Sequence, residues 1–286
     1  MATATTSPTE PHPIQCMEIW GGNRAIDNAL SVVGIDAWVF SDPVDHAPEG
    51  GDLHYVSMCG MGKISRFAVA DVSGHGPAVG ELAVSLRGLM RKYINTVDQS
   101  RFVRRLNEEF SRLASAGRFA TALLTSYYAP TDHLVVCNAG HPPPLWYRAG
   151  PRTWQFLEHD AHDRAPAVSN LPLGVIEPTD YHQFAVELGL GDLILIYSDS
   201  LIEAESPQTG LLGGEGLLEI VRQLDVSDPS RVHHALLDRI DAYRGGRPAH
   251  DDVTLIVLHH NGADPPRPSL GQMAKSVAKM MGILKV

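Results

Sequence analysis

The chain has 286 residues, of which 44% are hydrophobic and 20% charged, and its formal net charge is −10. This composition excludes a disordered chain and provides enough apolar residues for one large domain or two small ones. The acidic balance argues against a general nucleic-acid binder, because such a protein needs a basic face to contact phosphate groups.

The cysteines and the N-terminal residues indicate where in the cell the protein is expected. Cys16, Cys59 and Cys137 are widely separated, with the spacing of neither a disulfide framework nor a zinc site. We expect reduced thiols in a cytoplasmic protein. Residues 1–13 lack the basic start and apolar run of a secretory signal. No segment approaches the roughly 20 apolar residues that a membrane helix requires, so we expect no integral membrane span.

In chain order, β-type runs come in blocks instead of alternating with helices. The predicted strands are 37–40, 53–58, 64–72, 119–128, 134–137, 145–147, 184–188, 193–197 and 253–258. Apolar residues three and four apart predict helices over 77–93, 102–113, 217–224 and 231–243. This order favours an α+β fold with antiparallel sheets over a doubly wound parallel sheet.

Carboxylates stand where several predicted strands begin or end. Asp52 precedes one strand, Asp71 and Asp199 stand at the ends of two others, and Asp251-Asp252 opens the last. Each alone has a simple explanation, since Asp caps backbone amides in turns. Together they suggest a cation site, because apolar strands would otherwise deliver costly buried charges. Mg²⁺ and Mn²⁺ prefer such oxygen ligands.

Six short motifs follow one another in this chain. They are Gly50-Gly51-Asp52, Asp71-Val72-Ser73-Gly74-His75-Gly76, Asn138-Ala139-Gly140-His141-Pro142-Pro143, Leu171-Pro172-Leu173-Gly174, Tyr197-Ser198-Asp199 and Asp251-Asp252-Val253-Thr254. This series, spread over residues 35–259, resembles the protein phosphatase 2C (PPM) superfamily. Within it, the chain resembles the bacterial SpoIIE-like branch, whose stress-response members act on anti-sigma factor antagonists.

The resemblance implies an α-β-β-α sandwich of two antiparallel sheets flanked by helices, with two divalent cations, Mn²⁺ or Mg²⁺, at one edge. Asp71 resembles the carboxylate that bridges both metals, joined on one of them by the carbonyl of Val72. Asp199 and Asp251 resemble ligands of the second metal, and Asp52 resembles a ligand of the first. A hydroxide shared by the two cations would attack the phosphorus atom in line.

The chain also departs from the family pattern. Tyr55 stands where the branch usually has a second Asp, and Ser200 where it usually has Gly. Eukaryotic relatives use a histidine as general acid where this chain has Ser73, with His75 nearby, and Arg24 is a weak candidate for their phosphate-binding arginine. The changes at Tyr55 and Ser200 remove no expected metal ligand.

Three functions stay open at this point. The first is a metal-dependent serine/threonine protein phosphatase acting on a phosphorylated signalling partner. The second is a catalytically impaired metal-binding signalling module that recognises a partner without turnover. The third is a small-molecule phosphomonoesterase. A serine hydrolase is disfavoured, because the Gly-x-Ser-x-Gly motif is absent.

The predicted organisation is an N-terminal extension (1–34), the phosphatase domain (35–260), and a proline-rich linker with an amphipathic helix (261–286). That helix is expected to dock on its own domain or a twin subunit, and the alternatives are a partner-binding or a membrane-surface helix. In the family the two helices after the bridging Asp act as a switch and dimer surface, so a homodimer through residues 77–115 is our hypothesis. The pairs His233-His234 and His259-His260 are expected to lie on the surface.

Overall fold

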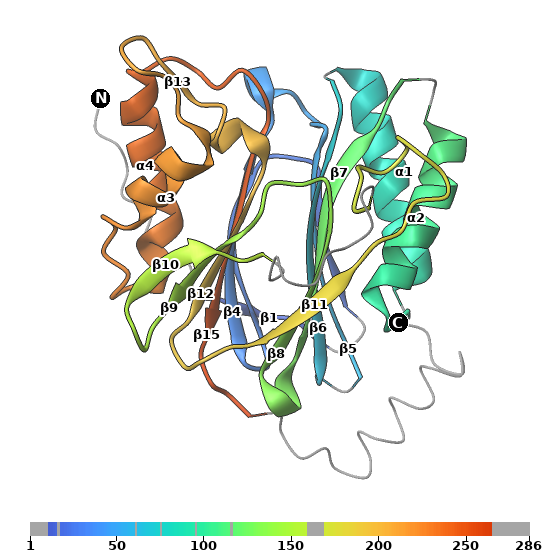
Figure 1. The fold of residues 1–286 in the computed structure, drawn as a ribbon, viewed down its shortest axis with the longest axis horizontal. Helices are drawn as coiled ribbons and strands as arrows, with labels where there is room; N and C mark the ends of the chain where they lie inside the picture. Colours follow the sequence, from blue (N-terminus) through green and yellow to red (C-terminus); the bar gives the residue numbers. More distant parts are fainter. Residues whose placement is uncertain are drawn as a thin grey trace.

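The computed structural model describes residues 11–15, 18–60, 62–74, 76–94, 96–114, 117–158 and 169–264. These residues form two stacked, mostly antiparallel β-sheets with a pair of helices on each outer face (Figure 1). The predicted α-β-β-α sandwich is therefore confirmed.

One sheet, here sheet A, contains seven strands. In spatial order they are β1 (His12–Pro13), β3 (Ile26–Val32), β4 (Ile35–Asp42), β15 (Val253–His260), β12 (Leu193–Tyr197), β9 (Leu145–Arg148) and β10 (Thr153–Phe156). Only the β1–β3 pair is parallel. Tyr197 lies opposite Leu255, so the end of β12 lies beside the start of β15.

The other sheet, sheet B, contains six antiparallel strands. In spatial order they are β11 (Gln183–Glu187), β8 (His133–Ala139), β7 (Ala120–Tyr128), β6 (Ile64–Val72), β5 (Asp52–Cys59) and β2 (Ile19–Gly22). The neighbouring strands β5 and β6 run in register from Asp52 opposite Asp71 to Cys59 opposite Ile64. This register brings the start of β5 beside the end of β6.

Four α-helices of the described residues cover the outer faces. They are α1 (Pro77–Tyr93), α2 (Gln99–Leu113), α3 (Gly213–Val221) and α4 (Val232–Arg244). Proline is well suited to the first turn of a helix, where Pro77 begins α1. Asp98 caps α2 by accepting a hydrogen bond from the Arg101 amide. Gly245 ends α4 at a φ of 65°, in the left-handed region that favours glycine.

Three apolar clusters correspond to the three interfaces between these four layers. The first fills the space between the sheets, where Val39 and Ile256 of sheet A pack with Phe67 of sheet B. The second lies between sheet B and the pair α1 and α2, and the third between sheet A and the pair α3 and α4. Burial on these faces fixes the positions of the strand ends that carry the aspartates.

The shortest elements connect the main layers. Four single turns of 3₁₀ helix are η1 (Val44–His46), η2 (Ala129–Thr131), η3 (Asp199–Leu201) and η4 (Pro229–Arg231). A small hairpin joins β13 (Glu205–Ser206) to β14 (Gly210–Leu211). Of these, η3 directly follows a strand of sheet A and carries one of the predicted ligands.

The structure differs from the sequence expectation near the N-terminus. The strands β1, β2 and β3 all precede residue 35, inside the segment expected to be an extension. Strand β3 pairs with β4 in sheet A, and β2 pairs with β5 in sheet B. At Gly21 an added Cβ would lie 2.3 Å from the carbonyl oxygen of His54, so the glycine permits this close strand pairing. Part of the segment 1–34 therefore belongs to the sandwich.

Several other expectations concern residues outside the described ones, including Cys16, His75 and the helix expected at the end of the chain. Cys59 and Cys137 are free thiols. No helix within the described ranges has the length and apolar character needed to cross a membrane.

Candidate active site

Asp52 and Asp71 face each other on neighbouring strands of sheet B. Asp52 begins β5, Asp71 is the penultimate residue of β6, and the two are direct cross-strand partners. Like charges in this position repel each other. Asp52 is 2% exposed, and its Oδ2 atom is buried without a hydrogen-bond partner. An unpaired buried carboxylate oxygen is costly unless a cation or donor reaches it.

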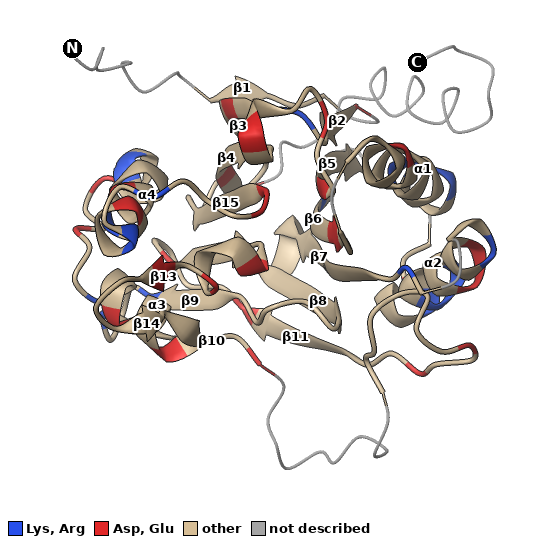
Figure 2. Cartoon of the chain, turned by 90° about the horizontal axis from the view of Figure 1, so that it is seen from above, with Lys and Arg blue, Asp and Glu red and all other residues tan. Residues whose placement is uncertain are grey.

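Asp199 and Asp251 come from sheet A at the same edge of the sandwich. Asp199 opens η3 immediately after β12, and Asp251 lies just before β15. The amide of Ser198 donates to the carbonyl of Thr254 at 2.9 Å, which continues the pairing of the two strands up to the aspartates. In the view from above, acidic residues occur on β5 and β6 and beside β15, whereas basic residues gather mainly on the helices (Figure 2).

Burial and neighbouring negative charges raise the pKa values of these carboxyl groups. Burial, followed by the charges of Asp199, Asp251 and Asp252, raises the pKa of Asp71 to about 7. Burial, followed by the charges of Glu203 and Asp251, raises the pKa of Asp199 to about 6. Burial and the charge of Asp71 raise the pKa of Asp52 well above its usual value. Without a positive charge nearby, simultaneous ionisation of these carboxyl groups is therefore unfavourable.

Asp252 joins the two sheets at this edge. Its Oδ1 accepts a hydrogen bond from the Val44 amide at 2.7 Å, and its Oδ2 accepts from the amides of Gly51 at 2.5 Å and Asp52 at 3.1 Å. The sequence motif suggested Asp251 as a metal ligand and suggested no role for Asp252. The structure shows that the buried Asp252 instead holds the start of β5 against β15.

Gly50 and Gly51 are required by this close approach. A Cβ at Gly50 would lie 2.4 Å from Oδ2 of Asp252. A Cβ at Gly51 would lie 2.9 Å from the carbonyl oxygen of Val72. Both glycines therefore bring the backbone to within contact of groups that belong to the site. In the Gly50-Gly51-Asp52 motif, the two glycines are explained by the lack of space and Asp52 by its charge.

The residues here offer the oxygen donors that divalent cations prefer. They supply four carboxylates, an orphaned oxygen on Asp52, and the Val72 carbonyl beside the backbone that leads into Asp52. Oxygen ligands of this kind suit Mg²⁺ and Mn²⁺. The chemistry of the donor set and the raised pKa values of Asp71 and Asp199 both favour a positive charge among these groups.

Comparison with known proteins identifies the family. The family model described as stage II sporulation protein E (SpoIIE) matches residues 62–261. The chain belongs to the SpoIIE family. This places it in the SpoIIE-like branch of the PP2C (PPM) superfamily.

Two characterised bacterial proteins are similar to parts of the chain. Phosphoserine phosphatase RsbU of Bacillus subtilis is 26% identical over 194 residues, which cover 68% of this chain and 55% of RsbU. Phosphoserine phosphatase RsbP of the same organism is 23% identical over 140 residues, covering 47% of this chain and 32% of RsbP. The chain thus spans about half or less of the length of these relatives.

Solved structures share the SpoIIE-type fold. The RsbU and RsbW domains of a Mycobacterium tuberculosis protein superpose with a TM-score of 0.67 and 23% identity, covering 90% of this chain and 70% of that one. The PP2C phosphatase domain of Bacillus subtilis SpoIIE, with a fragment of its regulatory domain, gives a TM-score of 0.64 and 17% identity, covering 85% and 64%.

The structure accounts for two departures from the SpoIIE-family pattern. Tyr55 is 2% exposed and packs in the cluster between sheet B and the helices α1 and α2, so it faces away from a solvent-accessible site. Ser200 is also buried, and its carbonyl accepts a hydrogen bond from Nη2 of Arg244 at 3.0 Å. Arg244 thereby fixes the backbone next to Asp199.

Other polar residues near the candidate site make contacts that the sequence did not predict. Arg118 lies against the loop after Asp71, with Nη1 3.5 Å from the Ser73 carbonyl. The buried imidazole of His141 lies 2.8 Å from the hydroxyl of Thr121, which is the cross-strand partner of Asp71. Burial lowers the pKa of His141 to about 4. Neither contact has a local sequence signal, because each depends on strand pairing.

Arg24, the weak candidate for a phosphate-binding arginine, is paired with an acidic residue in the structure. Its Nη2 forms an ion pair with Oε1 of Glu49 at 2.7 Å on the protein surface. A cavity of about 310 Å³ lies beside the aspartates instead, and Glu203, Arg244 and Asp251 are among its lining residues. Asp251 is the one of the four site aspartates that lines this cavity, and both acidic and basic side chains form its walls.

Proposed function

We propose that this chain is a metal-dependent serine/threonine protein phosphatase that hydrolyses phosphoserine or phosphothreonine on a signalling partner, such as an anti-sigma factor antagonist. The observation that carries the proposal is the meeting of Asp52 and Asp71 of sheet B with Asp199 and Asp251 of sheet A at one edge. Membership of the SpoIIE family and similarity to phosphoserine phosphatases support this reaction class.

Asp52, Asp71, Asp199, Asp251 and the Val72 carbonyl would hold two divalent cations, Mn²⁺ or Mg²⁺. When bound, such cations supply an activated water and neutralise charge on the phosphoryl oxygens. The four carboxylates must lose their protons to serve as ligands, and Asp71 is the critical one because its pKa is about 7. Asp252 positions the backbone of Asp52 through the hydrogen bond at 3.1 Å.

The walls of the site suggest how a phosphoprotein would be held. We assign Arg118 to contact a phosphoryl oxygen, since its weak contact with Ser73 leaves other guanidinium donors available. The cavity lined by Glu203 and Arg244 has room for residues that flank the phosphorylated side chain. We further propose a cytoplasmic homodimer, with α1 and α2 as the contact surface.

Hydrolysis of para-nitrophenyl phosphate with Mn²⁺, with Mg²⁺ and with chelator tests the reaction. We expect metal-dependent turnover in the wild type and at least a 100-fold loss in Asp71→Asn, as seen when a main electrostatic group is removed. The matched control is Asp225→Asn, an exposed carboxylate bonded to the Ser227 amide, which should leave turnover unchanged.

The same preparation separates the alternatives. Metal binding without turnover, even with phosphorylated partner proteins, would favour the catalytically impaired signalling module. Turnover of para-nitrophenyl phosphate and small phosphomonoesters, with no activity on phosphoserine peptides or proteins, would favour a small-molecule phosphomonoesterase. Neither result is compatible with the proposed protein phosphatase.

A further inference from the structure

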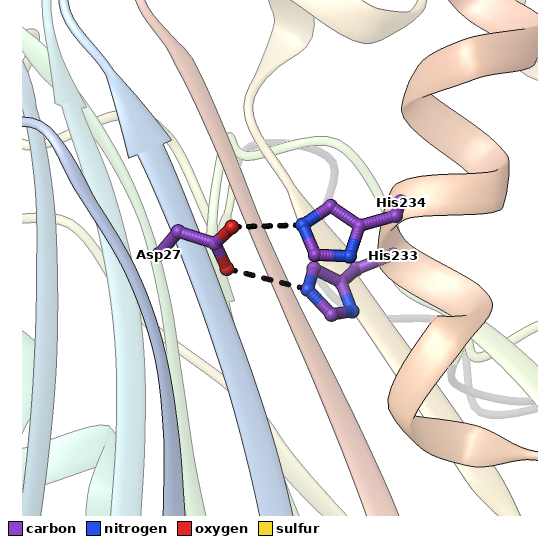
Figure 3. Close-up of side chains that lie close together, drawn as sticks. All are labelled: Asp27, His233 and His234. Atoms are coloured by element: carbon purple, nitrogen blue, oxygen red, sulfur yellow. Dashed lines mark hydrogen bonds and ion pairs between the residues drawn. The ribbon is translucent and has the colours of Figure 1, made fainter. Parts of the chain in front are cut away.

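Asp27, His233 and His234 come together where sheet A meets α4, outside the aspartate cluster. Asp27 is the second residue of β3, and the two histidines lie in the first turn of α4. Nε2 of His234 is 2.8 Å from Oδ2 of Asp27, and Nε2 of His233 is 3.4 Å from Oδ1 (Figure 3). The imidazole centroids are 3.9 Å apart, so both rings present a nitrogen to one carboxylate.

One side of this group is fixed and the other is open to solvent. The side chain of His233 is 3% exposed, which corrects the expectation that the histidine pair lies on the surface. The side chains of His234 and Asp27 are 48% and 44% exposed. An ion could therefore enter from solvent and keep a water as a further ligand, while the buried imidazole gives the site a defined position.

The protonation of His233 also suits a ligand. Burial, followed by the proximity of His234, lowers the pKa of His233 to about 4, although Asp27 acts in the opposite direction. The imidazole is therefore neutral at neutral pH and has a lone pair for a metal. The negative charge of Asp27 offsets the positive end of the α4 dipole, which by itself would disfavour a cation.

The chemistry of the three side chains decides which ion fits. Two imidazoles and one carboxylate are typical ligands of zinc and related transition metals, whereas Mg²⁺ prefers oxygen alone. One potential ligand atom from each side chain lies within 4.8 Å of the other two. Two ligand atoms that are each about 2 Å from a tetrahedral zinc ion lie about 3.3 Å apart, so small side-chain rotations would complete the site.

We propose that Asp27, His233 and His234 form a binding site for a transition-metal dication, with zinc the preferred ion, that fastens α4 to β3. Arg244, near the other end of α4, already bonds the Ser200 carbonyl. A metal at the first turn would therefore hold the helix at both ends. The site uses different elements and different ligand chemistry from the aspartate cluster.

Zinc binding to the full chain tests the proposal without any activity measurement. Protein stripped by chelator and then saturated with Mg²⁺, to fill oxygen-ligand sites, is titrated with Zn²⁺ against a chromophoric zinc indicator. We expect one zinc per chain. His234→Gln and Asp27→Asn should each weaken zinc binding at least tenfold, and both positions are exposed enough for the variants to fold.

The matched control is His259→Gln, since His259 is another histidine beside an aspartate on sheet A, with Nδ1 3.8 Å from Asp36. It should bind zinc like the wild type. Asp71→Asn should also bind zinc normally, which separates this proposal from the phosphatase proposal. Co²⁺ should give an absorption spectrum of a nitrogen-ligated tetrahedral site in the wild type and lose it in His234→Gln.

Two results would overturn the zinc site. One is equal zinc affinity in the wild type, His234→Gln and Asp27→Asn, which would show that these side chains are not ligands. The other is loss of zinc binding in Asp71→Asn, which would place the ion in the aspartate cluster. Thermal unfolding with and without zinc provides a second reading, with a rise in Tm expected for the wild type and absent in His234→Gln.

Discussion

Asp71 and Asp199 should make the metal-free protein less stable as the pH rises. Their pKa values change from 3.8 to about 7 and about 6 on folding. Between these limits the unfolded chain has lost protons that the folded chain still binds, so the free energy of unfolding falls with increasing pH. Below pH 3.8 these groups are protonated in both the folded and the unfolded state, so they no longer lower the free energy of unfolding.

Thermal unfolding in chelator from pH 4.5 to pH 8 measures this effect. We expect the Tm of the wild type to fall over this range, and to fall less in Asp71→Asn, because one of the two main titrating groups is absent. Added Mn²⁺ should raise the Tm most at high pH, where the carboxylates are ionised. An identical pH dependence in the wild type and Asp71→Asn would contradict this account.

Gly50→Ala should destabilise the protein and weaken its activation by metal. The added Cβ would meet Oδ2 of Asp252 at 2.4 Å, so the backbone must shift where it enters Asp52. Overpacking of this kind costs about 1–3 kcal/mol in the free energy of unfolding. Denaturant unfolding measures the cost, and the Mn²⁺ concentration for half-maximal phosphatase activity measures the effect on the site.

Gly88→Ala is the matched control for this substitution. Gly88 lies within α1 and an added Cβ would meet no atom within 4 Å. Alanine there should stabilise the protein by up to about 1 kcal/mol, because it has the higher helix propensity. If both variants behaved alike, the close approach at Gly50 would have no special role.

At the scale of elements, Asp252 is the connection between β15 and β5. Its carboxylate accepts hydrogen bonds from three backbone amides, two of which lead into Asp52. Asp252→Asn replaces one acceptor oxygen by a donor that would face an amide. We expect a loss of about 2–3 kcal/mol in the free energy of unfolding, in the range for hydrogen bonds to charged groups.

Asp192 offers a control with the same local chemistry at another place. It is buried, precedes β12 and accepts from the indole of Trp146 and the amides of Ala149 and Gly189. Asp192→Asn should cost similar stability but leave the Mn²⁺ requirement unchanged. Asp252→Asn should raise the required Mn²⁺ concentration several-fold. Equal Mn²⁺ requirements in the two variants would exclude a positioning role for Asp252.

At the scale of the molecule, the pair α1 and α2 is our proposed dimer surface. Val84 of α1 is 46% exposed and Leu113 of α2 is 52% exposed, which leaves apolar groups uncovered on this helical layer. We expect light scattering to give the mass of a dimer, and Val84→Lys to shift it toward the monomer. Leu211→Lys changes an equally apolar, 67% exposed residue on the small hairpin and should leave the mass unchanged. A strictly monomeric and fully active wild type would contradict the proposal.

The sequence by itself determined the fold class and most of the main elements. The helix predicted over 77–93 and the strands predicted over 64–72 and 193–197 match α1, β6 and β12 in their bounds. Proline at a helix start and long apolar runs are local signals, readable without knowledge of the partners. The positions of Asp52, Asp71, Asp199 and Asp251 at strand boundaries followed from the same signals.

Only the tertiary structure decided which carboxylates are buried and what each contacts. Gly51 and Asp252 are hydrogen-bonded across 201 positions of sequence, and Asp27 reaches His234 across 207. Nothing local distinguishes Asp252 from Asp251, or His233 from His234, although one member of each pair is buried. Burial and pairing depend on which strands and helices become neighbours, and that choice is made by the whole apolar core, not by the adjacent residues.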